Sequence, residues 1–118
     1  MMKRYATAEQ LLRRSTTLPP DEKQPWVELG SLYLDMHDYG QAERTLSAAL
    51  ERAPDDGSAL AYRSMAREEL GRLDDALADA AQSCDIGSPI GCDQAAHLRR
   101  RIADDLAAAA ARKSASAQ

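Results

Sequence analysis

Two cysteines and two histidines are the side chains of this sequence that could support catalysis or bind a metal. Cys84 and Cys92 flank a short segment that contains glycine and proline, so each lies near the end of a predicted helix. His37 and His97 have no ligand spacing to the cysteines or to each other. No serine–histidine–aspartate arrangement can be placed, and no glycine-rich phosphate loop is present. We therefore expect no enzyme, no metal site and no cofactor.

The stretch from Trp26 to Pro54 has the spacing of two packed helices. Large and small apolar residues recur three and four positions apart in each half, with a turn over residues 37–40. Pro54 ends the second helix. The residues of the pattern are Trp26, Leu29, Gly30, Tyr33, Ala42, Leu46 and Ala49. This spacing predicts an antiparallel helix pair in which small residues mark the close contact.

The spacing repeats at a period of about 34 residues, which is typical of a helical repeat. Ala8, Leu12 and Pro20 precede the equivalent residues of the central pair by that interval, and Ala76 and Ala80 follow them. The central stretch resembles the tetratricopeptide repeat, with Leu46 in place of the family's phenylalanine. The resemblance implies an all-α fold, a short right-handed α-solenoid of about six antiparallel helices.

The repeat pattern predicts one helical domain over residues 1–113. We expect a half repeat at 3–20, full repeats at 23–56 and 57–90, a capping helix at 89–112, and a disordered tail at 114–118. The capping helix has an apolar stripe of Ala95, Leu98, Ile102, Leu106 and Ala109.

The second repeat differs from the first on one packing face, where Arg63, Ser64 and Arg67 replace an apolar, a small and an aromatic residue. Two arginines on such a face are costly unless they reach water or pair with acids. Three carboxylates are candidates for that pairing, namely Glu68, Glu69 and Asp79.

Residues 83–92 resemble the junction of cysteine-rich Sel1-like repeats, which are related to the tetratricopeptide class. In exported proteins of that kind the resemblance implies a structural disulfide, here between Cys84 and Cys92. In the cytoplasm the two thiols would instead stay reduced and pack. We expect a cytoplasmic protein, or a periplasmic one if the chain is part of an exported protein.

The charge of the chain bears on its partners. Residues 23–90 carry 13 acidic and 6 basic side chains, which disfavours nucleic acid and anionic membranes and favours a basic partner. No stretch is long and apolar enough to span a bilayer. The abundance of alanine and arginine suggests a bacterial source.

The family resemblance implies that the first helix of each pair lines a concave groove. We expect this groove to hold a protein or peptide with apolar anchors and lysine or arginine, or else its carboxylates only solvate the surface. The function expected is therefore a non-catalytic interaction module, as in a bacterial scaffold or assembly factor. One alternative is self-association through the half-repeat ends into a homo-oligomer, and another is a disulfide-containing periplasmic module. The predicted groove residues are Gln24, Val27, Ser31, Leu34, Asp35, Ser58, Ala61, Tyr62, Met65, Glu68 and Glu69.

Overall fold

The structure, a computed structural model, describes residues 24–117, and the regular secondary structure of this part of the chain is α-helix. The helices are α2 (Gln24–Asp35), α3 (Tyr39–Arg52), α4 (Gly57–Glu69), α5 (Leu73–Ile86) and α6 (Pro89–Ala117). The predicted all-α class is confirmed. Five of the six expected helices lie in this part, whereas the expected half repeat at 3–20 lies outside the described residues.

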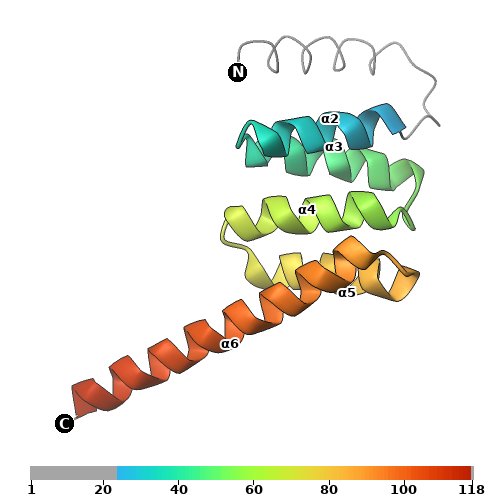
Figure 1. Cartoon of the computed structure of the whole chain (residues 1–118). Coiled ribbons are helices and arrows are strands. Elements are labelled where there is room, and N and C mark those ends of the chain that lie inside the picture. The colour runs from blue at the N-terminus through green and yellow to red at the C-terminus, as the bar shows by residue number, and fades with distance from the viewer. Residues whose placement is uncertain (1–23, 118) are drawn as a thin grey trace.

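The helices stack as successive antiparallel pairs (Figure 1). Helices α2 and α3 form the first pair, α4 and α5 form the second, and α6 crosses α5 and extends beyond the stack. One apolar cluster, which includes Leu29, Leu46 and Leu60, fills the space between α2, α3 and α4. A second, smaller cluster around Ala80 and Leu98 joins α5 to α6. Each pair is therefore stabilised by its neighbours and not by a single central core.

Acidic N-caps begin two of the helices. The carboxylate of Asp38 accepts a hydrogen bond from the backbone N–H of Gln41 at 3.3 Å, and that of Asp56 accepts one from Ala59 at 3.0 Å. Such caps satisfy N–H groups that have no partner within the helix. The loop before α6 begins at Gly87, whose φ of 107° is a left-handed value that favours glycine at a helix C-terminus.

The closest contact inside the first pair involves Gly30 and Leu46. A Cβ atom added at Gly30 would lie 2.5 Å from both Cγ and Cδ2 of Leu46, so no larger residue fits without a shift. Across the same pair, the guanidinium of Arg52 lies 4.8 Å from the ring centroid of Trp26. The sequence prediction that a small residue marks the contact between α2 and α3 is confirmed at Gly30.

Both arginines on the packing face of α4 pair with acids. Arg63 and Arg67 bond to Asp79 of α5, and Arg67 also bonds to Glu43 of α3. Asp79 was one of the three predicted partners. Glu68, another of them, bonds instead to residues of α6.

Helix α6 is longer than the sequence predicted. It continues to Ala117, so the expected end at 112 and the expected disordered tail from 114 are both wrong for residues 113–117. The run of alanines from 107 to 111 explains the difference, because alanine has the highest helix propensity. The apolar stripe is buried at Ala95 and Leu98, whereas Leu106 is 67% exposed.

Candidate functional site

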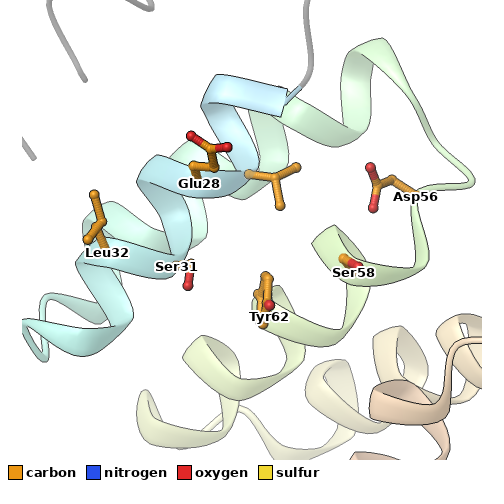
Figure 2. A pocket seen from close by; sticks show the side chains of 7 residues that line it. Glu28, Ser31, Leu32, Asp56, Ser58 and Tyr62 are labelled. Atoms are coloured by element: carbon orange, nitrogen blue, oxygen red, sulfur yellow. The ribbon is translucent and has the colours of Figure 1, made fainter.

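A hollow of about 440 Å³ lies between α2 and α4. Its floor is formed by Val27, which is buried, and Tyr62, which is half-buried. Figure 2 shows Ser31 pointing from α2 toward α4, with Tyr62 and Ser58 on the facing side of α4. The lining therefore combines apolar surface with three hydroxyl groups that can donate or accept hydrogen bonds.

Two carboxylates stand at the edge of this hollow. Glu28 is exposed on α2, and Asp56 is half-buried at the start of α4 (Figure 2). One oxygen of Asp56 caps α4 by accepting the hydrogen bond from the backbone N–H of Ala59. Among the described residues that line the hollow, the charged side chains are both acidic, so its edge suits a cation.

A second hollow of about 260 Å³ lies at the other end of the same two helices. Leu34 and Met65 supply its apolar lining. His37 and Tyr39 line the adjoining turn, where the Nδ1 atom of His37 lies 2.6 Å from the Tyr39 hydroxyl oxygen. Glu69 is exposed at its edge. The two hollows thus follow the α2–α4 face along its length.

The carboxylate of Glu68 also lines the second hollow but is held by α6. It accepts hydrogen bonds from Gln94 at 2.9 Å and Arg101 at 2.8 Å, and the His97 ring lies 2.7 Å from it. Burial alone would raise the pKa of Glu68, but the hydrogen bonds from Arg101, Gln94 and His97 outweigh it and lower that pKa. Glu68 therefore joins α4 to α6, and its charge is already neutralised within the chain.

The comparison with protein families bears directly on this arrangement. A family model for the tetratricopeptide repeat matches residues 27–89, which span the pairs α2–α3 and α4–α5. The chain belongs to the tetratricopeptide repeat family. Members of this family commonly mediate interactions between proteins or bind peptides, and they are typically non-catalytic.

Eight of the eleven groove residues expected from the tetratricopeptide resemblance line one of the two hollows. Of the other three, Ala61 is fully buried and Asp35 is exposed at the end of α2 and lines neither hollow. The side chain of Gln24 lies outside the described part of the chain. The eight that line a hollow are Val27, Ser31, Ser58, Tyr62, Leu34, Met65, Glu68 and Glu69.

Five lining residues were missed from the sequence, of which His37 and Tyr39 line the second hollow and three line the first. Glu28 and Leu32 directly follow Val27 and Ser31 on α2, so the hollow covers a wider strip of that repeat helix than the resemblance implied. Asp56 could have been identified as an N-cap, because it precedes Gly57 at the start of a predicted helix.

Cys84 and Cys92 are joined by a disulfide, with their Cα atoms 4.4 Å apart. The bond connects the last turn of α5 to the first turn of α6. Gly91 lets these turns approach, since a Cβ atom there would lie 2.1 Å from the Ser83 hydroxyl oxygen.

Within the part of the chain that the structure describes, no group of three or more histidine, cysteine, aspartate or glutamate side chains could hold a metal ion. None of the helices in residues 24–117 combines the length and the apolar character needed to span a bilayer.

Proposed function

We propose that this tetratricopeptide repeat chain is a non-catalytic interaction module that holds a peptide against the α2–α4 face of a short right-handed solenoid. The hollow between Val27 and Tyr62 supports this, because it is the larger of the two hollows described on that face and has an apolar floor. An apolar side chain of a peptide would occupy part of it and release water from both surfaces.

The peptide carries lysine or arginine next to its apolar anchor. Glu28 places negative charge at the edge of the hollow next to the N-cap Asp56, and among residues 24–117 no basic side chain lines it. Attraction between this charge and a cation on the peptide mainly speeds the association of the two molecules and makes the chain more selective for basic peptides. Glu68, which the sequence suggested as a further anchor, does not take part because it is bonded to α6.

A random peptide library displayed against the purified chain tests this proposal. We expect enriched peptides to share an apolar residue within a few positions of lysine or arginine. Their affinity for the wild-type chain and for two variants is then measured by titration calorimetry. Both substituted side chains are exposed in the free protein. Glu28→Lys and Ser58→Arg should each weaken binding by about tenfold, since each places positive charge at the hollow.

Glu51→Lys is the matched control, because Glu51 is exposed on α3 and lines neither hollow. It makes the same charge change as Glu28→Lys. Enriched peptides that bind both lysine variants equally well would overturn the groove assignment, and so would a library that yields only acidic peptides.

A second proposal concerns the cellular compartment. We infer that the chain works where disulfides persist, such as a periplasm, because Cys84 and Cys92 are bonded and disulfides are rare in cytosolic proteins. Protein taken directly from its source cells should resist alkylation until a reductant is added. Mass spectrometry that finds both cysteines alkylated without reductant would contradict this compartment.

A further inference from the structure

The outer half of α6 is exposed along its length. All side chains from Ala103 to Ala115 are exposed, and the helix leaves the stack in this region (Figure 1). The stripe that packs α6 on α5 through Leu98 continues outward as half-buried Ile102 and then as Leu106, which is 67% exposed. An apolar stripe that continues past its own partner can pack against another helix.

Charges of opposite sign flank the middle of this outer half. Asp105 lies one turn before Ala109, and Arg112 and Lys113 lie one turn after it. At 3.6 residues per turn, Asp105, Ala109 and Arg112 lie on the same side of α6 as Leu98. The helix thus carries acid, alanine and base in order along one face.

We propose that this face pairs with the same face of a second copy, antiparallel, about a twofold axis at Ala109. The twofold axis places the residues one turn before Ala109 in one copy opposite the residues one turn after Ala109 in the other copy. Asp105 therefore meets Arg112 and Lys113 of the second copy, and the symmetry repeats this contact. The small side chain of Ala109 lets the two helix axes approach closely at the crossing.

The overlap fits the shape of the molecule. A twofold at Ala109 sets residue 102 opposite residue 116, so the two helices overlap for about four turns and stop where each meets its own body. At that point a hollow of about 310 Å³ is lined by Leu73, Asp74, Ile102, Asp105 and Leu106. Its two carboxylates match the bases near the end of the second copy's helix.

The expected dimer is weak. Two helices crossing over four turns bury less area than a standard interface, so we expect a dissociation constant on the order of 10–100 µM. Sedimentation equilibrium of the full chain from about 5 to about 500 µM should show the mass rising from one chain toward two. Added salt should weaken the dimer, because the facing charges are exposed.

Two matched substitutions test the face. Ala109→Glu and Ala107→Glu make the same change two residues apart on the same exposed helix, but Ala107 points away from the proposed interface. Ala109→Glu should weaken the dimer by at least about tenfold, because it places two carboxylates at the twofold axis, whereas Ala107→Glu should leave it intact.

A charge exchange tests the pairing itself. Asp105→Arg alone and Arg112→Glu with Lys113→Glu should each abolish the dimer, and the triple variant should restore it. A single-chain mass at the highest concentration would overturn the proposal. Equal dissociation constants for the two glutamate variants, or a triple variant that stays monomeric, would also overturn it. Glu28→Lys should not affect the dimer, which separates this test from that of the peptide groove.

Discussion

The guanidinium of Arg63 on α4 donates two parallel hydrogen bonds to the carboxylate of Asp79 on α5. Nε binds Oδ2 and Nη2 binds Oδ1, both at 2.8 Å, and Nη1 of Arg67 reaches Oδ2 at 3.0 Å. Asp79 is only 4% exposed, so its charge would be costly without these partners. The second repeat therefore joins its two helices by an ionic contact where the first uses apolar packing.

Loss of the contact between Arg63 and Asp79 should destabilise the folded protein. Asp79→Asn keeps the side-chain volume but leaves two arginines facing a neutral group, and we expect it to lower the free energy of unfolding by about 2–3 kcal/mol. Urea denaturation followed by circular dichroism measures the change. Asp85→Asn is the control, because Asp85 is exposed near the end of the same helix and should change stability by less than about 0.5 kcal/mol. Similar values for the two variants would show that the pairing of Asp79 adds nothing.

The carboxyl groups of Glu43 and Glu68, which are also hydrogen-bonded to arginine, predict how stability depends on pH. Burial would raise the pKa of Glu43, but hydrogen bonds from Arg67 and Arg72 outweigh it and lower that pKa. The pKa of Glu68 is lowered in the same way by its α6 partners. A carboxyl with a lower pKa in the folded state contributes stability that is fully present above its unfolded pKa, about 4.3, and is lost as the pH falls through the folded value.

We therefore expect stability to be flat with respect to these two groups above about pH 5.5 and to decrease as the pH falls below about 4.5. Glu68→Gln should lower stability at pH 7 and make the loss at low pH shallower, because one of the two titrating groups is removed. Thermal unfolding at several pH values tests this. A Glu68→Gln profile parallel to that of the wild-type protein would contradict it.

Much of the fold could be predicted because it depends on local spacing. The positions of Leu29 and Leu46 follow the 3.6-residue period, and both are fully buried. The need of Arg63 for an acidic partner followed from the cost of burying a charge. The choice of Asp79 could not be predicted, since it depends on how α4 lies against α5.

The candidate site was harder to predict. The spacing places Leu34 and Met65 on one face, but it cannot show which carboxylates remain free. Glu68 is held by residues 26 to 33 positions later in the chain, on a helix whose direction the repeat pattern does not determine. The length of α6 was also missed, because the polar residues near its end resemble a tail.

The Cys84–Cys92 disulfide should stabilise the fold through the unfolded state. It closes a loop with a sequence separation of 8, for which the chain-entropy estimate is about 2–3 kcal/mol. The variant with serine at both positions should lose about that free energy of unfolding while keeping its helical content. Reduction of the wild-type protein should have the same effect, and reductant should leave the serine variant unchanged. Equal stability of the oxidised and reduced forms would contradict this role.

The last prediction compares equivalent positions of the two repeats. Gly30 faces Leu46 in the first pair, whereas Ser64 and Ala80 occupy those positions in the second, so a larger residue on one helix accompanies a smaller one on the other. Gly30→Ser should cost about 2–3 kcal/mol by overpacking, and Leu46→Ala should cost about 2–5 kcal/mol by leaving a cavity.

The double variant should cost less than the sum of the two by at least about 1 kcal/mol, because the serine then occupies part of the space that the leucine leaves. Urea denaturation of the four proteins gives this interaction energy. Gly40→Ala serves as the control for adding a methyl group, since only the flexible end of Arg44 lies near that position and helix propensity favours alanine. Strictly additive costs would show that the volumes of the two positions are independent, and the close contact of Gly30 with Leu46 would then not determine how the first pair packs.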